Sequence, residues 1–181
     1  GGFTLWFTGL SGAGKTTIAH FVGPELDRRG HIVEYLDGDT VRTRLSRGLG
    51  FSKEDRDTNI ERVGWVASRL TRHGAAVIVA AISPYDETRR AARAMIEEFG
   101  PFVEVFVKAS VEECARRDVK GLYAKAFAGE IKGFTGVDDP YEVPDDAEIV
   151  IDTEAHEPEE SARLIVTRLA ELGLVGAEVA A

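Results

Sequence analysis

FTLWFTGLSGAGKTT, residues 3–17, is the stretch of sequence that decides the fold. A short apolar run leads into the spacing Gly-x-x-x-x-Gly-Lys-Thr, and a helical pattern follows. The fixed positions of this spacing are Gly9, Gly14, Lys15 and Thr16. A strand that turns through glycines into a helix leaves consecutive backbone N–H groups free to bind anionic oxygens. In such a loop the lysine reaches the β- and γ-phosphates of a nucleotide, and the threonine hydroxyl holds Mg²⁺. The stretch therefore predicts a nucleotide-binding loop.

Length, composition and charge limit the classes of protein that fit. The chain has 181 residues, of which 44% are hydrophobic and 29% charged, a composition typical of a globular domain. A net charge of −9 argues against binding of a long nucleic-acid backbone, but not against binding of a small anion. No apolar run approaches the roughly 20 residues that span a membrane, and the lone Cys114 fits a reducing cytoplasm. We therefore expect a single cytoplasmic domain over residues 1–181 that binds a small ligand, with no nucleic acid and no membrane as partner.

Short apolar, β-rich runs alternate with stretches of helical periodicity along the chain. The expected strands cover residues 3–8, 31–36, 76–80, 102–107 and 148–151. The expected helices cover residues 16–29, 53–73, 84–99, 111–117 and 159–172. This alternation predicts a three-layer α/β/α fold of the P-loop NTPase type, with a mostly parallel five-stranded sheet and helices on both faces. Trp6 and Trp65 are expected in the core. Ligands of such sheets bind at the carboxyl ends of the strands, so the segments that follow the strands should converge on one crevice.

Two carboxylates, Asp37 and Asp39, follow the second expected strand. Acids beside a phosphate loop are unfavourable unless a cation is present. We therefore expect one of them, and Asp39 rather than Asp37, to assist Mg²⁺ or to accept the proton of an attacking hydroxyl. The alternative is that Asp39 caps a short helix over residues 41–45.

A second cluster of polar and aromatic side chains follows these acids. It consists of Arg42, Phe51, Arg56 and Asn59. Two arginines, an amide and an aromatic ring suit an anionic acceptor that carries a flat ring. The alternative is a solvated, charged helix face that carries surface ion pairs.

Two helix starts are indicated by their capping residues. Ser52 with Asp55 predicts a capping box at the start of the long helix. Ser83 followed by Pro84 is typical of an N-cap serine with proline in the first helical position. The cap explains Ser83, and a catalytic role for its hydroxyl remains the alternative.

Residues 118–143 form a long stretch of low periodicity, which indicates a mobile lid. This lid segment contains several lysines and glycines, and Phe134 stands between Gly133 and Thr135. The Phe134 ring is expected either to stack on a ligand or to pack within the protein. A lid that excludes water suits a kinase, because it protects ATP from hydrolysis.

Beyond the phosphate loop, the chain resembles the adenylyl-sulfate kinase (APS kinase) family of P-loop kinases. The resemblance rests on LDGDTVR, GLGFSKEDRDTNIERVGWVA, ISPYDETRR and RDVKGLYAKAFAGEIKGFTGVDDPYE. It implies transfer of the γ-phosphate of ATP to the ribose 3′-hydroxyl of adenosine 5′-phosphosulfate (APS), giving PAPS and ADP. The resemblance further implies direct in-line transfer with Mg²⁺, homodimerisation, and fusion to or cooperation with an ATP sulfurylase domain.

The resemblance also implies roles for individual residues. Catalytic roles would fall to Lys15, Asp39 and Ser83, with Ser83 as a site of alternative phosphorylation. ATP would contact Gly9, Ser11, Gly12, Ala13, Gly14, Lys15, Thr16, Thr17 and Arg116. Arg117 is the alternative to Arg116 beside the adenine of ATP, together with residues 153–157. Mg²⁺ would be held by Thr16 and Asp39. APS would contact Asp39, Arg42, Phe51, Arg56, Asn59, Ile82, Ser83, Lys120, Gly133 and Phe134.

Two other classes of function fit the sequence less well. A GTPase switch would be expected to carry an Asn-Lys-x-Asp guanine reader, which this sequence lacks. A kinase of shikimate or gluconate would not need Phe51 and Phe134, and a kinase of a plain nucleoside would not need the arginines.

Overall fold

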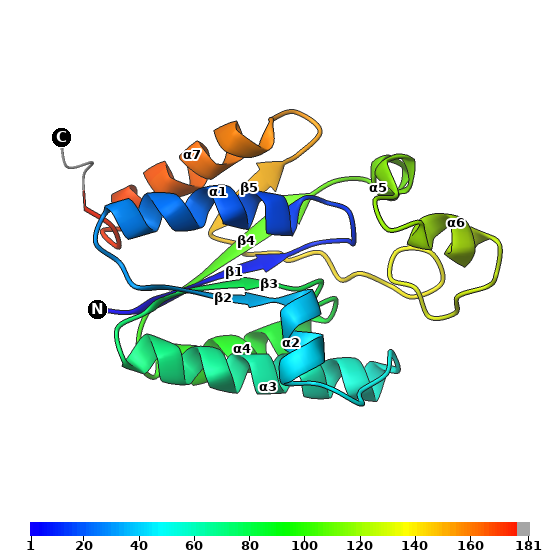
Figure 1. Ribbon diagram of the computed structural model, residues 1–181, viewed down its shortest axis with the longest axis horizontal. Coiled ribbons are helices and arrows are strands. Elements are labelled where there is room, and N and C mark those ends of the chain that lie inside the picture. The colour runs from blue at the N-terminus through cyan, green and yellow to red at the C-terminus, as the bar shows by residue number, and fades with distance from the viewer. Residues whose placement is uncertain (177–181) are drawn as a thin grey trace.

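The computed structural model describes residues 1–176 and is built around a five-stranded sheet in the order β2-β3-β1-β4-β5 (Figure 1). The strands are β1 (Phe3–Thr8), β2 (Val33–Asp37), β3 (Ala76–Ala80), β4 (Phe102–Lys108) and β5 (Ile149–Asp152). Each neighbouring pair is parallel, and β1 lies in the centre between β3 and β4. The predicted α/β fold with a parallel five-stranded sheet is therefore confirmed.

Helices cover both faces of this sheet. They are α1 (Lys15–Arg28), α2 (Gly38–Arg44), α3 (Lys53–Arg72), α4 (Asp86–Glu97), α5 (Val111–Arg117), α6 (Leu122–Phe127) and α7 (Pro158–Glu171). In Figure 1, α1 and α7 lie on one face and α3 and α4 on the other, while α5 and α6 lie beyond the carboxyl ends of the strands. Among the described residues, no helix is long and apolar enough to cross a membrane.

The central strand explains how the core is divided into two layers. All six residues of β1 are buried, as expected for a parallel strand covered on both faces. Successive side chains of a strand point to opposite faces. Accordingly Leu5 and Phe7 belong to the cluster with α1 and α7, whereas Trp6 belongs to the cluster with α3 and α4. Because each large apolar side chain contributes about 1.5–3 kcal/mol when fully buried, the phosphate loop leaves the sheet from a strand that is held firmly on both faces.

The expected element boundaries agree with the observed ones to within two residues, but three details differ. The segment expected to be irregular contains the short helix α6, which is too short to give a clear periodicity. The helix after β2 begins at Gly38 rather than at Val41. Trp65 is 57% exposed, whereas Trp6 is fully buried, so the prediction that Trp65 lies in the core was wrong. The buried stripe of α3 runs through Ile60, Val63 and Ala67, and Trp65 lies off this stripe.

Candidate active site

The loop between β1 and α1 has a backbone that only glycine can adopt at its key positions. A side chain on Gly9 would place its Cβ 2.5 Å from the carbonyl oxygen of Val107 in β4. Gly12 and Gly14 have φ values of 78° and 110°, in the left-handed region. The first turn of α1 contains no acidic residue. The amino terminus of the helix can therefore act with the loop N–H groups on an anion.

Lys15 lies folded over this loop and is largely buried, with 9% of its surface exposed. Its Nζ donates to the carbonyl oxygens of Gly9 and Leu10, each at 2.8 Å. Burial lowers the pKa of Lys15 to about 8, and the neighbouring Cys114 and Asp37 oppose this shift in part. An anion bound in the loop would favour the charged form of the lysine.

The oxygen ligands beside the loop come from α1 and from the end of β2. The Thr16 hydroxyl donates to Asp37 Oδ2 at 3.1 Å. The other oxygen of Asp37, Oδ1, accepts from the backbone N–H of Asp39 and caps α2. The alternative prediction that Asp39 is the helix cap was therefore wrong. A hydroxyl and a carboxylate are ligands that Mg²⁺ uses together with nucleotide phosphates, so the pair of Thr16 and Asp37 fits the ion.

Asp39 faces the lid segment. Its side chain is 82% exposed, and Lys120 Nζ lies 3.2 Å from Asp39 Oδ1. Such an exposed ion pair contributes little to stability, about 0–1 kcal/mol, because water and salt screen it. The contacts nevertheless form a continuous chain from Thr16 through Asp37 and Asp39 to the lid.

Arg56, in the first turn of α3, is buried against the lid segment. Its Nη1 donates to Asp139 Oδ2 at 2.7 Å and to the Tyr85 hydroxyl at 3.3 Å, and its Nη2 donates to the Gly133 carbonyl oxygen. Only 7% of the residue is exposed. Arg56 therefore joins α3, the segment after β3 and the lid.

Arg42 and Asn59 lie on the same side of the molecule as Arg56. Arg42 Nη1 donates to the Gly50 carbonyl oxygen at 2.9 Å, and its guanidinium carbon lies 4.5 Å from the centre of the Phe51 ring. Burial and the nearby charge of Arg56 lower the pKa of Arg42. Asn59 is 7% exposed, and its Oδ1 has no hydrogen-bond partner within residues 1–176. Two cations and a free acceptor thus share one partly buried region.

The two aromatic rings of the predicted acceptor pocket lie in different environments. Phe51 is 67% exposed. Phe134 is partly buried and packs edge-on against Tyr123 of α6, with the ring centres 4.9 Å apart. The Tyr123 hydroxyl in turn donates to the Ser11 carbonyl oxygen of the phosphate loop at 2.7 Å. Tyr123 therefore links the Phe134 ring to the phosphate loop.

Ser83 does not have the conformation expected of a helix cap. Helix α4 begins at Asp86, and Ser83 has a φ of 44°, so the predicted cap with Pro84 in the first turn was wrong. The Ser83 side-chain oxygen accepts from Trp6 Nε1 at 3.1 Å and donates to the Ala81 carbonyl oxygen. Because Ser83 is 2% exposed, its hydroxyl faces the core. A phosphoryl group on this oxygen would displace the contact with Trp6.

The two arginines at the end of α5 face different directions. Arg117 Nη1 donates to the carbonyl oxygens of Gly12 and Ala13, each at 3.2 Å. Arg116 has a side chain that is 73% exposed and pairs with Glu113. Of the two, Arg117 is the one that contacts the phosphate loop. Hydrogen bonds from Arg116 and Arg117 lower the pKa of Glu113 to about 2.

Three residues of this region are not indicated by the sequence patterns. They are Tyr123, Asp139 and Tyr141, and all three belong to the lid segment. An acidic pair at 138–139 within a lysine-bearing stretch was an available signal for Asp139. Nothing in the sequence indicates that the Tyr141 hydroxyl meets Thr8 Oγ1 at 2.8 Å.

The phosphate loop follows β1, and Arg42 and Arg56 lie on the helices that follow β2, at the same edge of the sheet (Figure 1). The lid segment contacts both regions, through Tyr123 and Asp139. The loop has the geometry that suits a polyphosphate, and the two arginines suit a second anion. The fold and the site therefore define a P-loop kinase.

Comparison with known proteins places the chain within this class. Residues 1–152 match the adenylylsulphate kinase family. The chain is 58% identical over 174 residues to an adenylyl-sulfate kinase of Picosynechococcus sp., covering 96% of this chain and 97% of the relative. It is 57% identical over 182 residues to a probable bifunctional SAT/APS kinase 2 of Sorangium cellulosum, covering 99% of this chain and 31% of that protein.

A solved structure agrees with this result. The structure of the Mycobacterium tuberculosis APS kinase CysC in complex with AMPPNP and APS has a TM-score of 0.89 and 42% identity, covering 93% of this chain and 98% of that one. The chain belongs to the adenylylsulphate kinase family. The activity of this family is the ATP-dependent phosphorylation of APS to PAPS with Mg²⁺, which confirms the expected enzyme class, substrate and cofactors.

Proposed function

We propose that this chain transfers the γ-phosphate of ATP to the 3′-hydroxyl of APS by direct in-line displacement between the phosphate loop and the Arg42–Arg56 pocket. The observation that carries the proposal is the chain of contacts from Thr16 through Asp37 and Asp39 to Lys120. This chain brings the phosphate loop and the lid to a common point. Catalysis of phosphoryl transfer is largely positioning and charge neutralisation, and the site contains the groups for both.

On the nucleotide side, the loop N–H groups and Lys15 bind the phosphates, and Thr16 with Asp37, rather than with the expected Asp39, would hold Mg²⁺. Mg²⁺ at this pair would supply neutralisation of the phosphate charge. Arg117 supports the loop through the carbonyls of Gly12 and Ala13 and replaces Arg116 as the arginine of this side. The remaining predicted contacts with ATP are backbone contacts of the loop residues Gly9, Ser11, Gly14 and Thr17.

On the acceptor side, Arg42 and Arg56 bind the phosphosulfate, and Asn59 offers its free Oδ1 to a ribose hydroxyl. Phe51 and Phe134 hold the adenine of APS between them. Backbone contacts from Ile82, Ser83 and Gly133 and the ammonium of Lys120 complete this pocket. Asp39 orients the 3′-hydroxyl and accepts its proton as the phosphate is transferred.

Ser83 shapes the pocket through its backbone in this proposal. Direct transfer from ATP to APS needs no covalent intermediate, and the hydrogen bond from Trp6 keeps the Ser83 hydroxyl inside the core. The predicted alternative phosphorylation of Ser83 would require the segment after β3 to rearrange.

The proposed function is tested by ADP release from Mg-ATP in the presence and absence of APS, with shikimate, gluconate and adenosine as alternative acceptors. We expect release that depends on APS and a product phosphorylated at the 3′-position. Equal release with every acceptor, or with none, would refute the proposed transfer.

Separate substitutions of the two aspartates test their division of roles. We expect Asp37→Asn to raise the Mg²⁺ concentration for half-maximal activity about tenfold, because it removes the carboxylate charge that is proposed to bind the ion together with Thr16. Asp39→Asn should instead lower kcat by about 100-fold, since it removes the proton acceptor. Magnesium titrations of ADP release at saturating ATP and APS measure both effects. The same rise in the Mg²⁺ requirement for both variants would contradict this division.

The pKa of Lys15 predicts a pH dependence of nucleotide binding. Burial lowers this pKa to about 8, whereas bound phosphates stabilise the ammonium form and raise it. Above pH 8 a proton must therefore be taken up on binding, and the Kd for nucleotide rises by up to about tenfold per pH unit. Calorimetry with AMPPNP, in two buffers of different ionisation enthalpy at pH values below and above 8, measures this uptake. A constant Kd without proton uptake would contradict the prediction.

We also propose that the chain is a single domain with a mobile lid over residues 118–143. Four glycines with positive φ, which can serve as hinges, support the mobility: Gly121, Gly129, Gly133 and Gly136. Trypsin digestion at the lysines of the lid, with and without AMPPNP and APS, tests it. Protection by the two ligands together is the expected result.

The assembly and location of the enzyme are further parts of the proposal. We infer a homodimer, and the exposed Trp65 on α3 supports a contact surface on that helix. Cooperation with or fusion to a sulfurylase domain is supported by the similarity to part of the longer SAT/APS kinase of Sorangium cellulosum. The lone, buried Cys114 supports a place in the reducing cytoplasm. The molar mass in solution tests the homodimer.

A further inference from the structure

Arg89, on α4, is a buried cation whose hydrogen bonds go to backbone carbonyls. Its side chain is 1% exposed. Nη1 donates to the Ser83 carbonyl oxygen at 2.6 Å and Nη2 to the Glu142 carbonyl oxygen at 2.5 Å. The nearest oxygens of Asp86 and Glu104 are each 3.8 Å away, and Nε has no hydrogen-bond partner within residues 1–176. Burial of a guanidinium is unfavourable unless its N–H groups are hydrogen-bonded. The two carbonyl contacts are therefore the interactions that hold Arg89 in place.

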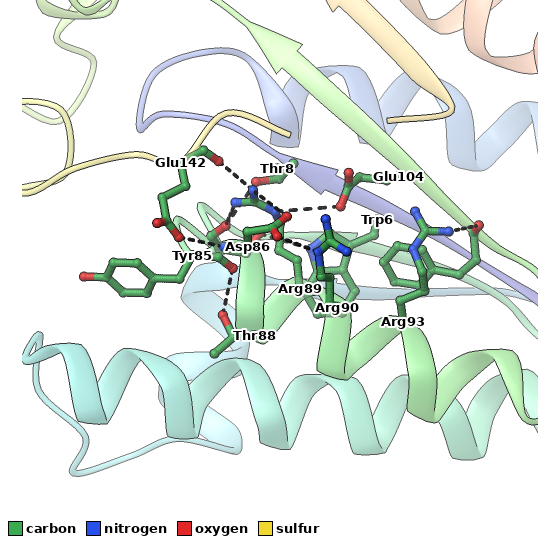
Figure 2. Close-up of polar contacts among 12 residues, drawn as sticks. Trp6, Thr8, Tyr85, Asp86, Thr88, Arg89, Arg90, Arg93, Glu104 and Glu142 are labelled. Carbon is green, nitrogen blue, oxygen red and sulfur yellow. Dashed lines mark hydrogen bonds and ion pairs between the residues drawn. The ribbon is translucent and has the colours of Figure 1, made fainter. Parts of the chain in front are cut away.

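The two carbonyls belong to segments that are far apart in the sequence, and Figure 2 shows Arg89 among Thr8, Glu104 and Glu142. Ser83 follows β3 with a φ of 44°, and its carbonyl oxygen also accepts from Thr8 Oγ1 at 3.3 Å. The backbone N–H of Glu142 donates to the Pro84 carbonyl oxygen at 2.8 Å. Arg89 is therefore a bridge between the turn after β3 and the end of the lid segment.

This end of the lid segment leads directly to the acceptor pocket. Residues 139–142, here called the lid arm, begin at Asp139, which accepts from Arg56 at 2.7 Å. The ring of Tyr141 lies 5.7 Å from the Arg89 guanidinium carbon. The lid arm thus runs from the arginine that faces the acceptor to the arginine that lies in the core.

We propose that Arg89 is a positioning residue for the acceptor. Its guanidinium fixes the lid arm against the turn after β3, so that Asp139 holds Arg56 in the orientation that binds the anion of APS. This inference rests on the proposed function, because that function assigns APS to the pocket beside Arg56. Among the described residues, the hydrogen bonds of Arg89 do not reach the phosphate loop. The effect of Arg89 therefore falls on APS rather than on ATP.

Steady-state kinetics of Arg89→Met test this role, because methionine keeps much of the buried volume and removes every donor. We expect kcat/KM for APS to fall by about 10- to 100-fold, as for a binding group displaced by about an ångström. The KM for ATP should stay within about twofold, because the hydrogen bonds of Arg89 do not involve the ATP site. Arg89→Lys keeps the charge and should recover part of the loss. If Arg89→Met does not fold, kcat/KM for APS is measured with Arg89→Lys instead.

Glu104→Gln is the matched control. It alters the buried acid beside Arg89 and leaves both carbonyl contacts in place, so its kcat/KM for APS should remain at the wild-type value. Parallel changes in the KM values for ATP and APS would overturn the proposal. So would a lower thermal midpoint in Arg89→Lys with unchanged kinetics, because a merely structural role predicts that result. Turnover of APS by the wild-type chain, measured alongside, tests the proposed function separately.

Discussion

Lys15→Ala is expected to lose about 10³-fold or more in kcat while remaining folded. Lys15 is the one side chain of the phosphate loop that combines burial, a positive charge and contact with two loop carbonyls. Its charge is costly before substrates bind, as its lowered pKa indicates, and is used when phosphates arrive. Removal of the ammonium therefore affects the transition state far more than the fold. ADP release at saturating APS, together with circular dichroism, measures the two effects.

The same substitution has a consequence for stability that can be checked independently. The pKa of Lys15 is about 8 in the folded chain and 10.5 in its ordinary state. Between these values the unfolded chain binds more protons, so this lysine makes the free energy of unfolding rise with pH. Lys15→Ala should lose that contribution, whereas Lys108→Ala, at the exposed end of β4, should keep both it and the activity. A folded Lys15→Ala enzyme with wild-type turnover would refute the assignment of the phosphate loop.

The parts of the site that could be predicted from the sequence depend on local chemistry. The loop between β1 and α1 needs glycine where a Cβ would lie 2.5 Å from a neighbouring carbonyl oxygen, and such a requirement leaves a fixed spacing in the sequence. The Ser52 cap of α3 is equally local, because its side chain accepts from the backbone N–H of Asp55 three residues later. Asp55 itself binds the Gly50 N–H, so the reciprocal half of the predicted capping box is absent from this helix start.

The parts that could not be predicted depend on contacts between distant segments or on helical phase. The pairing of Lys120 with Asp39 joins residues that are 81 positions apart. Arg116 and Arg117 are neighbours in sequence, yet a rotation of about 100° per residue places one in water and the other on the loop. The prediction for Trp65 was based on its large apolar side chain, but on an amphipathic helix the angular position decides burial.

Buried arginines were the least predictable feature, because arginine is ordinarily an exposed residue. Arg56 and Arg89 each end on a lid carbonyl, of Gly133 and Glu142 respectively. These two contacts tie the C-terminal half of the lid segment to α3 and α4. The lid segment is therefore held by the same kind of group that is proposed to bind the acceptor, and Asp139 accepts a hydrogen bond from one of these arginines, Arg56.

Arg56→Ala is expected to weaken APS binding by about 2–5 kcal/mol, the cost of losing a charge-assisted contact to a desolvated anion. The loss should be specific, because Arg56 contacts Asp139, Tyr85 and Gly133 and lies apart from the loop that holds ATP.

Separate measurements of KM for APS and for ATP distinguish this binding role of Arg56 from a structural one. Arg62→Ala is the matched control, since it removes an arginine from the exposed face of the same helix, and both KM values should then remain unchanged. If Arg56→Ala raises both KM values equally, Arg56 supports the fold rather than the acceptor. If only the KM for APS rises, the charge of Arg56 serves the acceptor, as the proposed function requires.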